Sequence, residues 1–195
     1  MEEAVIVSAV RTAIAKGGGA LKDLPPYIYG AEVIKEAIRR AQIDPMEVDD
    51  VIFGNALAGG GNVSRVTLLQ AGLPVDVPGF TIDRQCGSGM NAVALAAQAI
   101  QAGSGEIYIA GGTESMTRTP QLLEPSPKAY GSARFIPRIL SPEHIGNPPM
   151  GITAENLAEK YNISREEQDE YAYRSQMRMA HAMREGYFKE QIVPI

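Results

Sequence analysis

Short apolar segments alternate with helical segments between residues 5 and 111, and this alternation is the feature that most restricts the fold. Strand-forming residues occupy the segments 5–7, 50–54, 79–82 and 106–111. Apolar residues recur at helical spacing in 29–41, 62–71 and 91–102. Short apolar strands separated by helices are typical of a mostly parallel sheet with helices on both faces. The sequence therefore predicts an α/β fold.

The character of the sequence changes after residue 117. Seven of the thirteen prolines lie between Pro120 and Pro149, where hydrophobic periodicity disappears. Two interpretations of this stretch stay open: a flexible linker, or a functional loop that packs on another surface. The second is favoured by its large apolar residues, which are Tyr130, Phe135, Ile136, Ile139 and Leu140.

Two helices are predicted after the proline-rich stretch. The first covers 153–161, and the second begins at a capping box formed by Ser164 and Glu167 and ends at Gly186. Its inward stripe is expected to consist of Ala172, Gln176, Met179 and Met183. We therefore expect an α/β domain over 1–117 and a second, partial domain over 118–195.

Composition and charge exclude several classes of protein. The net charge of −5 provides no field that would attract nucleic acid or an anionic membrane surface. The single cysteine cannot form an internal disulfide, and no Cys/His cluster has the spacing of a zinc site. No segment approaches the ~20 apolar residues of a membrane span. We expect a folded cytoplasmic protein without a metal ion, nucleic-acid partner or membrane association.

The only cysteine, Cys86, is the strongest candidate for a functional residue. It lies between an apolar strand segment and an alanine-rich helical segment, and Gly87-Ser88-Gly89 follows it. The free N–H groups and dipole at the start of a helix favour the thiolate, which is the nucleophilic form of cysteine. Glycines beside Ser88 let a substrate carbonyl approach the backbone. A lone cysteine can also be a small buried hydrophobic residue, so both interpretations stay open from local pattern alone.

Five segments in order along the chain resemble the signatures of the thiolases. They are 7–12, 54–57 with 59–62, 83–89 around Cys86, 110–116, and 150–156. The resemblance covers nearly the whole chain. It implies a thiolase-like layered fold, with a mostly parallel sheet, helices on both faces and part of an inserted loop domain.

The resemblance also implies a function. Thiolases are acyltransferases of fatty acid metabolism, and their cysteine forms an acyl-cysteine with a coenzyme A thioester. Here that nucleophile is Cys86, with Gly87, Ser88 and Met150 as the expected substrate-binding residues. Coenzyme A thioester is a substrate, so no covalently bound cofactor is expected. The resemblance implies a homodimer or tetramer, with the usual dimer contact through the strand before Cys86.

Several thiolase signatures do not occur in these 195 residues. They are a Gly-His-Pro segment, an Asn-Glu-Ala-Phe-type segment and a second cysteine in a Cys-x-Gly motif. Neither His144 nor His181 lies in such a context, so neither is taken as a base. We expect the N-terminal half of a thiolase, inactive by itself and associating with acyl-CoA and a complementary C-terminal half. The alternative is a non-catalytic remnant that binds acyl-CoA or other thiolase subunits.

Overall fold

The computed structural model describes residues 3–57, 61–128 and 130–195, so Gly59 and Gly60 of one thiolase-like motif lie outside the described residues. The chain divides into two compact units. One comprises Met1–Pro120 with Glu190–Ile195, and the other comprises Gln121–Lys189. This division reflects contacts between residues of the chain and does not test where folding domains begin and end. The expected domain ranges, 1–117 and 118–195, therefore stay a prediction.

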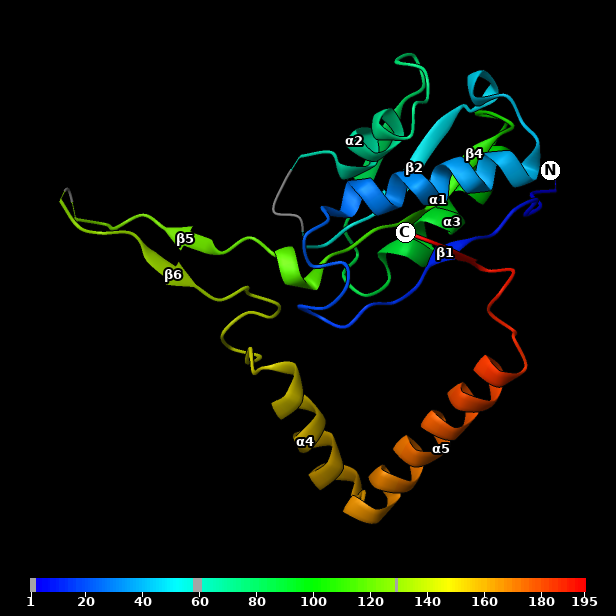
Figure 1. Ribbon diagram of the computed structural model, residues 1–195. Coiled ribbons are helices and arrows are strands. Elements are labelled where there is room, and N and C mark those ends of the chain that lie inside the picture. Colours follow the sequence, from blue (N-terminus) through cyan, green and yellow to red (C-terminus); the bar gives the residue numbers. More distant parts are fainter. Residues whose placement is uncertain (1–2, 58–60, 129) are drawn as a thin grey trace. The chain divides into compact units, whose positions relative to one another are not determined.

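A three-stranded parallel sheet forms the centre of the first unit (Figure 1). Its strands are β2 (Asp50–Gly54), β3 (Gly79–Ile82) and β4 (Tyr108–Gly112), in the order β3-β2-β4. The central strand β2 carries three consecutive buried residues, Val51, Ile52 and Phe53. A strand that is apolar on both faces must be covered on both faces, which is why the continuous apolar pattern predicted this strand correctly.

Helices cover both faces of the sheet, as the sequence predicted. Helices α1 (Pro26–Ala41) and α2 (Val63–Gln70) contribute Ile34, Ile38 and Leu68 to a core that includes Val51 and Phe53. On the other face, α3 (Ser88–Gln101) packs Ala92 and Ala96 against Ile52. Successive residues of β2 therefore point into two separate cores. The small alanine side chains of α3 permit a close approach to the sheet.

The prediction of a strand at residues 5–7 is wrong. These residues belong to no strand of the structure, and the side chains of Val5, Ile6 and Val7 are exposed. A strand needs a neighbouring backbone for its hydrogen bonds, and apolar character alone does not supply one. The N-terminal pairing lies further along, where β1 (Arg11–Thr12) runs parallel to β7 (Ile192–Val193).

The second unit contains a small hairpin that the sequence did not predict. Strands β5 (Leu122–Glu124) and β6 (Arg134–Ile136) pair antiparallel, with Leu123 opposite Phe135. Glu124 and Arg134 form an ion pair across the hairpin, with an N–O distance of 2.6 Å. Prolines interrupt helical periodicity, but short strands can form between them. The loss of periodicity therefore did not predict this hairpin.

Two helices follow the hairpin, α4 (Met150–Tyr161) and α5 (Arg165–Arg184), and Figure 1 shows them diverging from the turn between them. The predicted capping box is confirmed, because Ser164 Oγ accepts from Glu167 N and the Glu167 carboxylate accepts from Ser164 N. Two short 3-10 helices, η1 (Pro45–Glu47) and η2 (Met116–Arg118), belong to the first unit.

The predicted inward stripe of α5 is wrong, because its four residues are exposed. Neither α4 nor α5 contains a buried residue. In the proline-rich stretch, Tyr130, Phe135, Ile139 and Leu140 are exposed and Ile136 is half-buried, and the packing of this stretch on another surface stays a prediction. Among the residues that the structure describes, none of the helices is both long and apolar enough to cross a membrane.

Candidate active site

The carboxyl ends of the three parallel strands meet at one edge of the sheet, and three of the sequence motifs lie there. Asn55 follows β2, the segment 83–86 follows β3, and Thr113 with Glu114 follows β4. In open α/β sheets, ligands bind outside the carboxyl ends of the strands. This edge, called the carboxyl edge below, is therefore the candidate site.

Cys86 lies in a tight turn that joins β3 to α3. Gln85, the residue before it, has φ +48°, which is a left-handed conformation that side chains other than glycine rarely adopt. Asp83 Oδ1 accepts a hydrogen bond from Gln85 N at 2.8 Å, and Gly87 N donates to Arg84 O at 3.0 Å. A strained residue that its surroundings hold in place is a common feature of functional turns.

Ser88 fixes the same turn from inside. Its hydroxyl accepts a hydrogen bond from Arg84 N at 2.9 Å and donates one to Gln85 O at 2.7 Å. The side chain is buried, with 5% of its surface exposed. Its hydroxyl is therefore engaged in holding the Cys86 turn, and the expectation that Ser88 binds substrate stays a prediction.

The Cys86 side chain is exposed. A Cβ atom built on Gly87 would come no closer than 3.5 Å to another residue, and one on Gly89 no closer than 3.9 Å. Both are ordinary van der Waals distances, so neither glycine is required to avoid a clash beside the exposed thiol. Such a thiol can attack a carbonyl that approaches from solvent. That Cys86 is the nucleophile and that Gly87 contacts the substrate stay predictions.

Gly54 at the end of β2 packs directly against the start of α3. A Cβ atom at Gly54 would lie 2.6 Å from Ser88 C, Ser88 Cβ and Gly89 N. Only glycine permits this approach, which sets the distance between the central strand and the helix that follows Cys86.

Asn55 and Glu114 are structural partners at the carboxyl edge to which the sequence analysis assigned no role. Asn55 Nδ2 donates to Thr113 O at 2.7 Å and to Glu114 Oε1 at 3.0 Å. Glu114 Oε2 also accepts from Ala56 N at 2.8 Å and from Leu57 N at 3.2 Å. The signal that could have identified them is the run of polar residues after two of the parallel strands, Asn55 directly after β2 and Thr113 with Glu114 after β4.

The remaining candidate residues lie in the second unit. Met150 is the first residue of α4 and is 67% exposed, and its expected contact with substrate stays a prediction. His144 and His181 are also exposed. Within residues 3–57, 61–128 and 130–195, no group of three or more His, Cys, Asp or Glu side chains is arranged to hold a metal ion.

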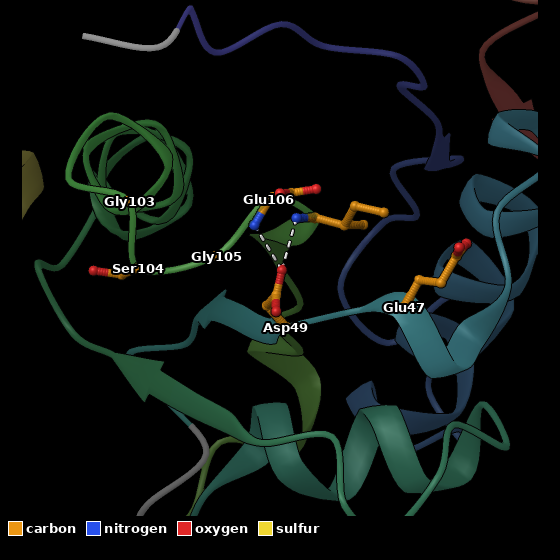
Figure 2. A pocket seen from close by; sticks show the side chains of 7 residues that line it. Glu47, Asp49, Gly103, Ser104, Gly105 and Glu106 are labelled. Atoms are coloured by element: carbon orange, nitrogen blue, oxygen red, sulfur yellow. Dashed lines mark hydrogen bonds between the residues drawn. The ribbon is translucent and has the colours of Figure 1, made fainter.

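A hollow of about 480 Å³ lies at the opposite, amino edge of the sheet. Figure 2 shows Glu47, Asp49 and Glu106 around it, together with the turn 103–105 that precedes β4. Asp49 Oδ2 accepts from Glu106 N at 2.7 Å and from Ile107 N at 2.9 Å. These bonds connect the segment before β4 to the segment before β2, so Asp49 stabilises the sheet at its amino edge.

The stability contribution of Asp49 is expected to depend on pH. Hydrogen bonds from Ile107 N and Glu106 N lower the pKa of this carboxyl below its ordinary value of 3.8. Because the pKa of Asp49 is lower in the folded state than in the unfolded state, its stabilisation is fully present at pH values above the unfolded-state pKa. The stabilisation is lost as the pH falls through the folded-state pKa. Asp49→Asn should lower the melting temperature by ~2–4 °C near neutral pH, and by less as the solution is acidified. Melting curves across a pH series test this, and a pH-independent difference would contradict it.

The fold and the site together define a class. The first unit is a parallel α/β structure that presents an exposed cysteine on a strained turn between a strand and a helix. The sequence matches the family described as thiolase, N-terminal domain, over residues 4–195. This chain belongs to the thiolase family.

Individual relatives agree with this assignment. The chain is 43% identical over 202 residues to a probable acetyl-CoA acyltransferase of Staphylococcus epidermidis, covering 100% of the chain and 51% of the relative. It is 44% identical to an acetyl-CoA acetyltransferase of Cupriavidus necator, with the same coverage. The crystal structure of the Bacillus anthracis acetyl-CoA acetyltransferase is similar with a TM-score of 0.88 and 40% identity, covering 100% of this chain and 51% of that one. The chain thus spans about half the length of the curated relatives that it matches.

Proposed function

We propose that this chain supplies the nucleophilic cysteine of a thiolase-type acyltransferase that moves acetyl or longer acyl groups between coenzyme A thioesters. The observation that carries the proposal is the exposed Cys86 on its strained turn at the carboxyl edge. The names of the relatives, acetyl-CoA acyltransferase and acetyl-CoA acetyltransferase, support the choice of substrate.

In the proposed reaction, the Cys86 thiolate attacks the carbonyl carbon of an acyl-CoA. A bond forms between Cys86 Sγ and that carbon, the bond from the carbon to the coenzyme A sulfur breaks, and coenzyme A leaves as a thiol after taking up a proton. In the direction of synthesis, the acyl group on Cys86 then passes to an acyl-CoA carbanion and the Cys86 thiolate is released. In thiolysis, the thiolate attacks the 3-keto carbon of a 3-ketoacyl-CoA, the bond between C2 and C3 breaks, and the departing acyl-CoA carbanion takes up a proton. The acyl group on Cys86 then passes to the sulfur of a second coenzyme A, whose thiol proton is removed. Both steps need an acid or base, and we propose that a complementary half of the enzyme supplies it.

The proposal includes partners and location. Besides acyl-CoA, we propose a second copy of the chain, as a homodimer or tetramer, or a complementary C-terminal half. Strand β3 supports this association, because within the described residues only one of its sides is paired. A cytoplasmic location and a role in fatty acid metabolism belong to the same proposal.

The second candidate function is non-catalytic binding of acyl-CoA or of thiolase subunits. It is favoured by the positions of the two histidines, because both are exposed and both lie in the second unit, away from the Cys86 turn in sequence. This candidate predicts binding of acetyl-CoA without acylation of Cys86.

Acetoacetyl-CoA thiolysis separates these functions. The 195-residue chain alone should show no thiolase-like turnover, because each missing acid–base group typically contributes ~10²–10⁴-fold. A chimera of this chain with the C-terminal half of the Cupriavidus necator relative should turn over and carry an acetyl group on Cys86, detected by mass spectrometry. Light scattering should show that the 195-residue chain and the chimera each form oligomers.

Two results would count against the proposal. Turnover by the chain alone that Cys86→Ala abolishes would contradict the need for a complementary half. A folded chimera that binds acetyl-CoA but neither acylates Cys86 nor turns over would favour the non-catalytic function.

A further inference from the structure

The end of strand β2 is bonded to both of its neighbours. Asn55 N donates to Ile82 O, the last residue of β3, at 3.1 Å. On the other side, Thr113 N donates to Gly54 O at 3.1 Å. The position of Gly54 and Asn55 therefore determines where β3 ends, four residues before Cys86, and where α3 can pack.

The carboxylate of Glu114 binds the segment after Gly54. Glu114 accepts hydrogen bonds from the Asn55 side chain and from the backbone N–H groups of Ala56 and Leu57. Asn55 is buried, with 7% of its surface exposed, and its amide donates to Thr113 O at 2.7 Å as well as to Glu114 Oε1 at 3.0 Å, so Thr113 and Glu114 together orient it. The backbone of Glu114 is anchored in turn, because Tyr29 Oη donates to Glu114 O at 2.5 Å.

Only a carboxylate fits this arrangement of donors. Three N–H groups converge on the two oxygens of Glu114, and a carboxylate offers acceptors at both positions. A glutamine would keep one acceptor and place an NH₂ group against N–H groups. The contacts of Gly54 with Ser88 and Gly89 then connect the held segment to the turn that carries Cys86.

We infer that Glu114 is a positioning residue for Cys86, which it acts on through the segment 55–57 and the Gly54 contact with α3. The effect on acyl transfer rests on the proposed function, but the effect on the thiol does not. Glu114 holds the segment that follows β2 in place. The end of β2 in turn contacts the start of α3 and the end of β3, and the Cys86 turn connects β3 to α3.

Asp49 offers a matched control for this inference. Its carboxylate also accepts backbone N–H groups and also joins the β2 and β4 segments, but at the amino edge of the same sheet. Asp49→Asn and Glu114→Gln therefore make the same chemical change at opposite edges. If Glu114 had a purely structural role, the two variants would change the reactivity of Cys86 equally when their losses of stability are equal.

The test measures the rate at which iodoacetamide alkylates Cys86, together with hydrogen exchange of the amides of 84–88 and the melting temperature. Because Cys86 is the only cysteine, every alkylation event reports this thiol. Glu114→Gln should slow alkylation by about threefold or more and speed exchange in the turn, since small displacements of a reacting group carry large rate effects. Asp49→Asn should leave both close to the wild-type values.

Equal effects of the two variants on Cys86, or no effect of Glu114→Gln, would overturn the inference. If Glu114→Gln does not fold, Glu114→Asp serves the same test. Aspartate keeps the charge, but its shorter side chain cannot reach both the Asn55 side chain and the N–H groups of Ala56 and Leu57. Iodoacetamide requires no coenzyme A chemistry, so a failure of the proposed acyl transfer leaves this result interpretable.

Discussion

Replacing Cys86 with serine is expected to reduce thiolysis by the chimera by on the order of 10³-fold or more. Serine nearly preserves the size of the side chain, but its hydroxyl is not ionised near neutral pH and is a much weaker nucleophile than a thiolate. The acetyl group on residue 86 should disappear from the mass spectrum together with turnover. The measurement is acetoacetyl-CoA thiolysis under saturating substrate.

Two controls show whether the loss is chemical. Because Cys86 is exposed, Cys86→Ser should leave the melting temperature close to that of the parent protein. Asp49→Asn in the same chimera should retain turnover at temperatures below its melting point. Retention of most activity by Cys86→Ser would show that another group forms the acyl intermediate, and the proposed role of Cys86 would be wrong.

Gly54→Ala is expected to destabilise the first unit by about 3 kcal/mol, which is ~6–12 °C in melting temperature. The new Cβ would lie 2.6 Å from three atoms of Ser88 and Gly89, two of which belong to the backbone and cannot rotate away. Relief of the clash requires α3 to move away from β2, so the turn that carries Cys86 must move as well. Thermal denaturation gives the loss of stability, and the alkylation rate of Cys86 gives the displacement of the turn.

Gly111→Ala is the matched control for this prediction. Gly111 lies in β4 opposite Phe53, the neighbour of Gly54, but a Cβ there would meet only Phe53 Cε1, at 3.7 Å. That is an ordinary van der Waals distance, so Gly111→Ala should cost much less stability than Gly54→Ala. Similar melting temperatures for the two variants would contradict the packing argument.

The central sheet could be predicted from the sequence because its strands carry their own signal. The run Asp50–Gly54 is buried on both faces, so its apolar residues are consecutive, and both its bounds and those of Gly79–Ile82 were predicted correctly. Residues 5–7 carry the same signal without forming a strand, because pairing depends on what lies beside a segment and sequence periodicity does not report that.

The candidate site could be predicted only in part. The position of Cys86 between a strand and a helix is a local pattern, and the structure has it between β3 and α3. The bonds of Ser88 to Arg84 and Gln85 are local in sequence but depend on the backbone geometry of the turn, whereas the bond between Asn55 and Glu114 depends on the distance between segments far apart in the chain. The two residues are 59 positions apart, and no local pattern specifies their contact.

The pairing of β1 with β7 has a consequence for the order in which the chain folds. Arg11–Thr12 can meet Ile192–Val193 only after nearly the whole chain has been gathered, and closing so long a loop costs conformational entropy. The pairing joins two residues of each strand, with Arg11 N bonded to Gln191 O, Arg11 Nε to Gln191 Oε1, and Arg40 to Glu190 O. The sheet β3-β2-β4 spans a much shorter stretch of sequence and so has a lower contact order. We therefore expect the terminal pairing to form last on folding and to open first on heating, while the sheet that carries Cys86 stays intact.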